Sequence, residues 1–144
     1  MNEKIIARAA EIIRAKTDGV GGGMEGFCTL ALLDENGYPT ASTLTISKAD
    51  GIKWLTFCAS ISTNKAKRIA KCNRGSVCVN SSEYNISLIG TLEIITDPEI
   101  KKEMWYEVLQ HHWSGPDDPD YCVLRFNTER YNLFVDWEEA AGVL

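Results

Sequence analysis

The chain has 144 residues, a net charge of −5 at pH 7, and hydrophobic and charged fractions of 44% and 24%. This length fits one domain over residues 1–144, and this composition is typical of globular proteins. Because the chain is acidic, we do not expect it to bind nucleic acid. Lys4 and Arg8 interrupt the N-terminal apolar pattern, and no uncharged apolar run reaches the roughly 18 residues of a membrane span. The sequence therefore predicts a cytoplasmic protein with no membrane partner.

The cysteines and histidines argue against a metal centre. None of the five cysteines has Cys-x-x-Cys spacing, so neither a zinc site nor a disulfide framework is expected. The two histidines, His111 and His112, are adjacent. Neighbouring residues on a helix point about 100° apart, which is unsuited to binding one metal ion. We predict no metal site, and a catalytic Cys–His pair stays an alternative without a local motif in its favour.

The first half of the chain reads as a helix followed by antiparallel strands. Apolar residues at helical spacing predict a first helix over residues 3–16, and three consecutive glycines indicate a loop over residues 19–26. Three strands follow, joined by turns at 34–37 and 49–51; they cover residues 27–33, 40–47 and 53–58. In the second strand Thr43, Thr45 and Ser47 share one face. That hydroxyl row fits either a ligand contact or plain solvated β surface.

The third strand runs into a basic helix that is predicted to begin at Thr63 or Asn64. Five of the fifteen Lys and Arg residues fall within ten positions here: Lys65, Lys67, Arg68, Lys71 and Arg74. A helix start presents free backbone N–H groups and the positive end of the helix dipole, which suits a phosphate. An amphipathic helix with a solvated basic face explains the same residues, so both interpretations stay open.

The second half of the chain predicts more antiparallel strands. They cover residues 76–80, 85–95, 121–127 and 131–137, the last two as a hairpin, and Gly90 marks a bulge or bend. Asp97 and Pro98 start a helix expected to end near His111, and residues 113–120 form an acidic loop led by Trp113. The total is about seven strands and three helices. Hairpin connections indicate an antiparallel sheet or barrel.

Six strings in this order resemble the pyridoxamine 5'-phosphate oxidase-like flavoproteins, particularly their short general stress protein 26-like branch. The strings lie at residues 36–39, 57–65, 89–93, 97–98, 105 and 113–121. The resemblance implies a mainly β fold, a split β-barrel with flanking helices. It also implies a homodimer that holds FMN in two clefts at the subunit interface.

The resemblance also implies roles for particular residues. Thr63 and Lys65 match the stretch that binds the flavin phosphate, and Asn85 matches a glutamine near the ribityl chain. Three further groups of contacts are implied. Those along the flavin ring are Phe57, Cys58 and Ala59, and those from the second strand are Ser42, Thr43 and Leu44. The loop of the partner subunit contributes Trp113 and Ser114.

Three departures from the family pattern argue against pyridoxamine phosphate oxidation. Ser42 stands where the oxidases have an arginine, Asn64 replaces a basic residue, and the chain stops at Leu144 without the C-terminal Arg- and Trp-containing segment. We therefore expect an FMN-dependent oxidoreductase acting on an unidentified small molecule, of which a nitroaromatic is one example. A non-catalytic flavin carrier or stress-linked sensor is the main alternative. Haem or a deazaflavin in place of FMN is a third, with His111 or His112 as the haem ligand.

Overall fold

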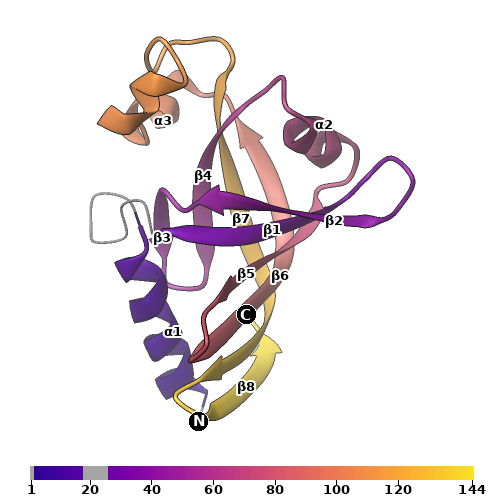
Figure 1. Cartoon of the computed structure of the whole chain (residues 1–144), viewed down its shortest axis with the longest axis vertical. Helices are drawn as coiled ribbons and strands as arrows, with labels where there is room; N and C mark the ends of the chain where they lie inside the picture. The colour runs from indigo at the N-terminus through magenta and orange to yellow at the C-terminus, as the bar shows by residue number, and fades with distance from the viewer. Residues whose placement is uncertain (1, 18–25) are drawn as a thin grey trace.

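A computed structural model describes residues 2–17 and 26–144 (Figure 1). The elements follow in the order α1 (Glu3–Ala15), β1 (Phe27–Leu33), β2 (Pro39–Thr45), β3 (Lys48–Asp50), β4 (Trp54–Ser60), α2 (Asn64–Lys71), β5 (Arg74–Asn80), β6 (Tyr84–Ile95), α3 (Pro98–Glu103), the 3-10 helix η2 (Glu107–His111), β7 (Tyr121–Val135) and β8 (Glu138–Val143). Apart from Gly26, the expected glycine loop lies outside the described residues. None of the described helices is long and apolar enough to cross a membrane.

One antiparallel sheet forms the body of the protein. Its strand order is β2-β1-β5-β6-β7-β4-β3, and β8 pairs with the second half of β7. The sheet curls strongly, so that β1 and β2 cross the direction of β6 and β7, and the end of β2 comes into contact with β4 (Figure 1). The expected mainly β, split-barrel fold is confirmed.

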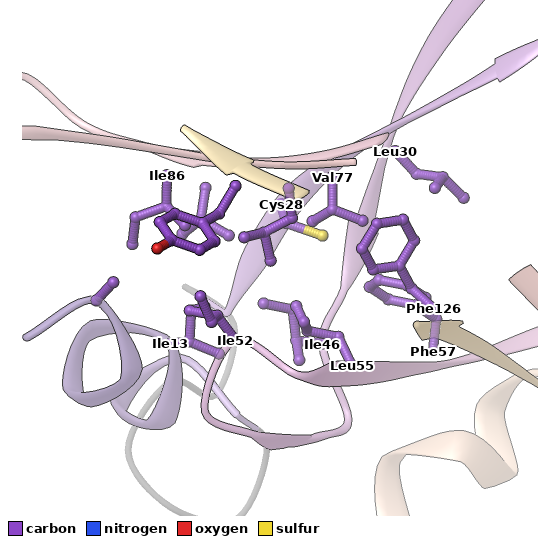
Figure 2. Close-up of a cluster of buried hydrophobic side chains, with 14 of the residues drawn as sticks. Ile13, Cys28, Leu30, Ile46, Ile52, Leu55, Phe57, Val77, Ile86 and Phe126 are labelled. Atoms are coloured by element: carbon purple, nitrogen blue, oxygen red, sulfur yellow. The ribbon is translucent and has the colours of Figure 1, made fainter. Parts of the chain in front are cut away.

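The inside of the curled sheet is the hydrophobic core. Inward-facing side chains from strands on opposite walls meet there, with Leu30 and Val77 facing Phe57 and Phe126 (Figure 2). Helix α1 adds Ile13 to the same cluster and packs against β3, β7 and β8. Helix α2 packs against β1 and β6. Non-directional apolar burial of this kind holds the two walls together.

The β1–β2 hairpin has the predicted turn. The Asp34 carboxylate accepts hydrogen bonds from the amides of Asn36 and Tyr38, both at 2.9 Å. Gly37 has φ +81°, a left-handed conformation that glycine adopts without a steric penalty. The pairing that follows runs without a shift from Leu33 opposite Pro39 to Phe27 opposite Thr45.

The strands before α2 correct the prediction in two ways. Residues 48–50 form a short strand, β3, rather than part of a turn, and the turn lies at Gly51, which has φ +57°. Strand β4 pairs with β3 and β7, so it does not continue the β1–β2 hairpin. The hydroxyl row also breaks, because Ser47 lies beyond the end of β2 and is buried, with its Oγ 2.7 Å from Thr56 Oγ1.

The predicted final hairpin is wrong. Residues 121–135 form one strand, whose first half pairs with β4 and whose second half pairs with β8. The register against β6 shifts at Gly90, as predicted, and the backbone oxygen of Asn127 lies where a Cβ on Gly90 would stand. The actual turn is at Asp136 and Trp137, which have φ 53° and 65°. A bulge in mid-strand therefore accounts for the polar residues interpreted as a turn.

The helix after Asp97 is shorter than predicted. Asp97 caps it as expected, with its Oδ1 accepting from the amides of Glu99 and Ile100, but α3 ends at Glu103. Tyr106 then adopts an extended conformation before η2. The break turns Trp105 onto Tyr121, with ring centroids 5.3 Å apart. The segment expected to be the middle of the helix is therefore non-helical, and its Trp105 packs on Tyr121 instead.

Candidate functional site

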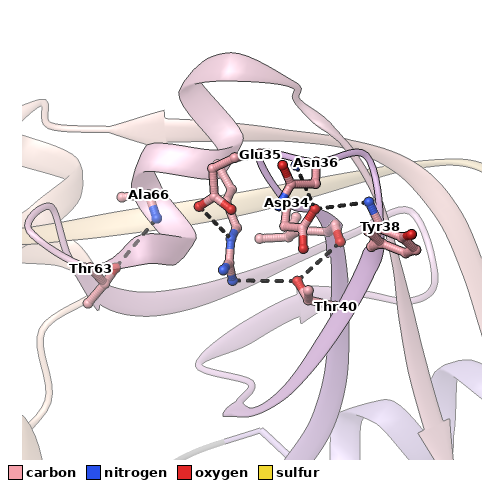
Figure 3. Close-up of polar contacts among 9 residues, drawn as sticks. Asp34, Glu35, Asn36, Tyr38, Thr40, Thr63 and Ala66 are labelled. Carbon is pink, nitrogen blue, oxygen red and sulfur yellow. Dashed lines mark hydrogen bonds and ion pairs between the residues drawn. The ribbon is translucent and has the colours of Figure 1, made fainter.

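Helix α2 begins where the sequence predicted. Thr63 is its N-cap: the Thr63 hydroxyl accepts a hydrogen bond from the Ala66 amide at 3.4 Å (Figure 3). The same hydroxyl donates a hydrogen bond to the Ser60 carbonyl at 2.7 Å. Lys65 is half-buried in the first turn, which contains no acidic residue. The first amides of a helix have no acceptor within the helix, so this end offers N–H donors and a cation to an anion.

The hydroxyls that precede α2 are already engaged within the chain. Ser62 donates its amide and hydroxyl to the Asp120 carboxylate at 3.0 and 3.1 Å. Thr63 uses its hydroxyl for the cap. Ser60 Oγ accepts a hydrogen bond from Trp113 Nε1 at 2.9 Å, which leaves the Ser60 proton free to donate. The positive charge of Lys65 and the helix amides, rather than a row of hydroxyls, therefore make this end suitable for an anion.

Two strand edges meet beside this helix start. The Ile46 amide donates to the Gly26 carbonyl and the Asp34 amide donates to the Tyr38 carbonyl. In an antiparallel pair, hydrogen-bonded and non-hydrogen-bonded positions alternate, so the backbone N–H and C=O groups of Thr43 and Thr45 point away from β1. Strand β2 pairs only with β1 within the described residues, and this edge is the one that approaches β4.

The facing edge belongs to the second half of β4. The Ile61 amide bonds to the Asp120 carbonyl, so the same alternation directs the backbone groups of Cys58 and Ser60 away from β7. Strand β3 pairs with β4 only from Trp54 to Thr56, so it does not cover this edge of β4 beyond Thr56. The Ser60 carbonyl accepts from the Thr63 amide and hydroxyl, so the Ser60 amide is the group of that residue that points toward β2, next to the start of α2.

The loop that follows η2 covers the outer side of β4. Trp113 packs on Tyr121, with ring centroids 5.2 Å apart. Lys101 is buried beneath this loop: its Nζ donates to the Asp118 carbonyl at 3.0 Å and lies 5.4 Å from the centroid of the Tyr121 ring. The Asp118 carboxylate accepts from Ser114 and Asp120. This network holds Trp113 beside the end of β4 in its own chain.

The predicted site residues divide between the two faces of the sheet. Ser42 and Leu44 are half-buried and lie on the inward face, whereas Thr43 lies on the outward face. The side chains of Phe57 and Ala59 are buried in the core, so only their backbone could meet a ligand. Cys58 is half-buried on the outer side, with its Sγ 3.8 Å from the Tyr121 hydroxyl and 3.9 Å from the Met104 carbonyl. Ser114 is exposed and bonded to Asp118.

Asn85 does not join the other candidates within one chain. It is exposed at the start of β6, where its Oδ1 accepts from Cys78 Sγ at 3.3 Å. Helix α2 lies over the other end of β6, where the Leu92 amide bonds to Asn73. Seven residues of strand separate Asn85 from Leu92, roughly 23 Å at 3.3 Å per residue. One chain thus assembles Lys65, the two edges and Trp113, but not Asn85.

Two of the cysteines are unsuited to nucleophilic chemistry. Burial raises the pKa of the Cys28 thiol to about 12 and that of the Cys122 thiol to about 11. Both therefore stay protonated at neutral pH, and a protonated thiol is a poor nucleophile. His111 and His112 are exposed at the end of η2. Within residues 2–17 and 26–144, no three His, Cys, Asp or Glu side chains are grouped so that they could hold a metal ion.

Sequence reasoning missed two residues that shape this site. Lys101 is buried although lysine is rarely buried without a partner, and Asp120 anchors the Trp113 loop to Ser62. The acidic run at 117–120 was visible as a loop. Its partners were not, because they lie far away in the sequence.

Comparison with known proteins identifies the family. The family model for pyridoxamine 5'-phosphate oxidase matches residues 23–134. The chain belongs to this family. No curated protein sequence matches it.

Solved structures of the family share the fold. A Clostridium acetobutylicum protein related to general stress protein 26 matches with a TM-score of 0.82 and 24% identity, covering 100% of this chain and 97% of that one. General stress protein 26 from Bacillus anthracis matches with a TM-score of 0.76 and 18% identity, covering 97% and 98%. An FMN-binding protein related to pyridoxamine 5'-phosphate oxidase from Nostoc punctiforme matches with 0.70 and 16%, covering 99% and 96%. At these identities the likeness establishes the fold.

Proposed function

We propose that the protein binds FMN between β2 and β4 and uses it as an oxidoreductase on a small molecule. The observation that carries this proposal is the position of Lys65 and the start of α2 directly beside the two facing strand edges. The FMN phosphate takes the helix start, where Lys65 supplies a full charge and the first-turn amides supply donors. The flavin ring lies along the edges, where backbone groups of Thr43 and Cys58 and the Ser60 amide face it.

Two further features support this arrangement. Ser42 is half-buried on the inward face of β2, where its hydroxyl suits the ribityl chain. Trp113, held by Ser60 and Tyr121, presents an aromatic ring at the end of β4, where it is placed to cover a flat ligand. Asn64, at the first position of α2, contributes an amide but no charge. Lys65 therefore carries most of the electrostatic attraction for the phosphate.

A second copy of the chain completes the proposed site. The outward face of β1 and its turn expose Phe27, Leu33 and Tyr38, which are 46%, 38% and 69% exposed. A homodimer formed on this face buries apolar surface that is otherwise in water. It also explains Asn85, because a residue remote from Lys65 in its own chain is free to reach the flavin of the partner.

The chain needs no acid or base of its own for this function. Bound FMN supplies the hydride or electron transfer, and the protein positions it and keeps water away. Cys28 and Cys122, with raised thiol pKa values, take no part. The substrate stacks on the open side of the ring beneath Trp113, so any planar, reducible small molecule of matching size is a candidate.

Anaerobic spectroscopy tests the proposal. Purified protein is titrated with FMN, and NADH or NADPH is then added while the flavin absorbance is followed. We expect uptake of FMN and bleaching by a nicotinamide. If FMN is taken up but is not bleached by NADH, by NADPH or by another reductant, and passes no electrons to an added acceptor, only the non-catalytic flavin carrier would remain. No uptake of FMN, or uptake of haem in its place, would overturn the proposal.

A further inference from the structure

A cavity lies beside α2. It has a volume of about 230 Å³ and lies between α2 and the β1–β2 hairpin. Its lining includes three cations of α2, two residues of the hairpin and one cysteine, namely Lys67, Arg68, Lys71, Leu33, Glu35 and Cys72. We call it the α2–hairpin cavity. Lys67 and Lys71 are four residues apart and share a helix face, and Arg68 lies three residues after Lys65, next to it on the helix surface.

Arg68 has an unused donor in this cavity. Its Nε is buried and has no hydrogen-bond partner in the described part of the chain. The nearest carboxylate oxygen, Glu35 Oε1, is 3.7 Å away, which is too long for a hydrogen bond (Figure 3). The Arg68 Nη1 reaches Thr40 Oγ1 only at 3.5 Å. A buried donor without an acceptor is costly, so the geometry calls for an acceptor at this point.

The charges around the cavity favour an anion. Asp34 also lines it, but the Asp34 carboxylate is committed to the turn amides of Asn36 and Tyr38. Glu35 is the one remaining carboxylate of the lining, and its side chain is 58% exposed. Three cations therefore face two carboxylates, of which only Glu35 is loosely placed, and the lining keeps a net positive charge. A guanidinium flanked by ammonium groups binds phosphate or carboxylate oxygens well.

We propose that the α2–hairpin cavity binds the phosphate or carboxylate group of a small molecule, held by Arg68 together with Lys67 and Lys71. Glu35 competes with that group for the guanidinium. The side chains of Leu33 and Cys72 line the rest of the cavity and contact the apolar part of the ligand. The volume is below that of common drug-sized sites, so the ligand is small. Asn64, at the first position of α2, also lines this cavity, so the cavity adjoins the proposed FMN phosphate site at the start of the helix.

Protection of Cys72 from alkylation reports on this cavity directly. The protein is treated with iodoacetamide in the presence of increasing inorganic phosphate or succinate, and each cysteine is followed by peptide mass spectrometry. We expect the anion to slow labelling of Cys72 but not of Cys78, which lies on β5 outside the cavity. Stronger protection by phosphate identifies a phosphate ligand, and stronger protection by succinate identifies a carboxylate ligand.

Variants that remove a cation and a variant that removes the competing carboxylate should change the protection in opposite directions, which makes the test specific. Arg68→Gln and Lys71→Gln should each weaken protection about tenfold, because each removes one charge from the cavity. Glu35→Gln should strengthen it, because the competing carboxylate is gone. Lys102→Gln is the matched control, because Lys102 is exposed on α3, and it should behave as the unmodified chain. Lys71 is exposed, so its variant keeps the test valid if Arg68→Gln fails to fold. Absence of protection by either anion, or protection that none of the cavity variants changes, would overturn the proposal.

Discussion

Trp113 donates a hydrogen bond from its indole Nε1 to Ser60 Oγ across 2.9 Å and so joins the loop after η2 to the end of β4. The two residues are 53 positions apart in the sequence. Their contact places an aromatic ring next to the strand edge on which we locate the flavin. The same loop is fastened to the next turn by Asp120 and Ser62. The position of Trp113 therefore depends on β4 and on the turn between β4 and α2 together.

Replacing Trp113 by Phe tests this connection. The variant keeps a ring to pack on Tyr121 but loses the donor, so the free energy of unfolding should fall by about 0.5–1.5 kcal/mol. Urea denaturation measures the change. Trp137→Phe is the control, because Trp137 is 87% exposed and its loss should change stability by less than about 0.5 kcal/mol. Equal effects of the two variants would show that the Ser60 contact does not stabilise the fold.

Gly90→Ala tests the bulge between β6 and β7. A Cβ at position 90 collides with the backbone oxygen of Asn127, which cannot move without disturbing the strand pairing. We expect a loss of at least about 1–3 kcal/mol in unfolding free energy. Gly115→Ala, where nothing lies within 4 Å of the added Cβ, should have little effect. A Gly90→Ala protein as stable as Gly115→Ala would contradict the observed register.

Acid should loosen the Trp113 loop through Asp118. Hydrogen bonds from the amides of Ser114 and Asp120 hold the pKa of the Asp118 carboxyl below its ordinary value of 3.8. A carboxyl whose pKa is lower in the folded state stabilises the fold above its ordinary pKa, and that contribution disappears as the pH falls through the lower folded value. We therefore expect the stability difference between the unmodified chain and Asp118→Asn to shrink as the pH falls below 3.8. Unfolding free energies measured across the acid range check this, and a difference that is constant with pH would contradict it.

Local patterns in the sequence were enough to predict much of the fold. The β1–β2 hairpin was predictable because Asn36 and Gly37 favour its turn and both strands carry β-forming residues. The start of α2 was predictable for a similar reason, since Thr63 is a good N-cap placed before a helical pattern. These signals act between residues close in sequence.

The errors arose where distant partners decide the structure. The polar residues at 128–130 resemble a turn, but pairing with β6 and β8 on either side keeps β7 continuous through them. The Glu138–Val143 strand has few β-forming residues and exists because β7 offers it an edge. Contact with Tyr121 likewise turns Trp105 out of the expected helix.

The candidate site was predictable in part. Thr63 and Lys65 followed from the helix start, and the family resemblance added the strand residues. Two features depended on the folded chain. The facing edges of β2 and β4 require knowledge of which strands pair, and the engagement of Ser62 by Asp120 joins segments 58 residues apart. Asn85 joins the site only in the proposed homodimer, and the sequence of one chain does not position a second chain.

The affinity for FMN of two lysine variants tests the central claim most directly. Lys65 and Lys71 lie on the same short helix, at its start and its end, and each replacement by Ala removes one positive charge. Flavin fluorescence titration should show that Lys65→Ala binds FMN about ten- to a hundredfold more weakly, since a charge-assisted hydrogen bond is worth about 1.5–3 kcal/mol. Lys71→Ala should bind FMN as the unmodified chain does. Equal affinities for the two variants would contradict a phosphate site at the start of α2.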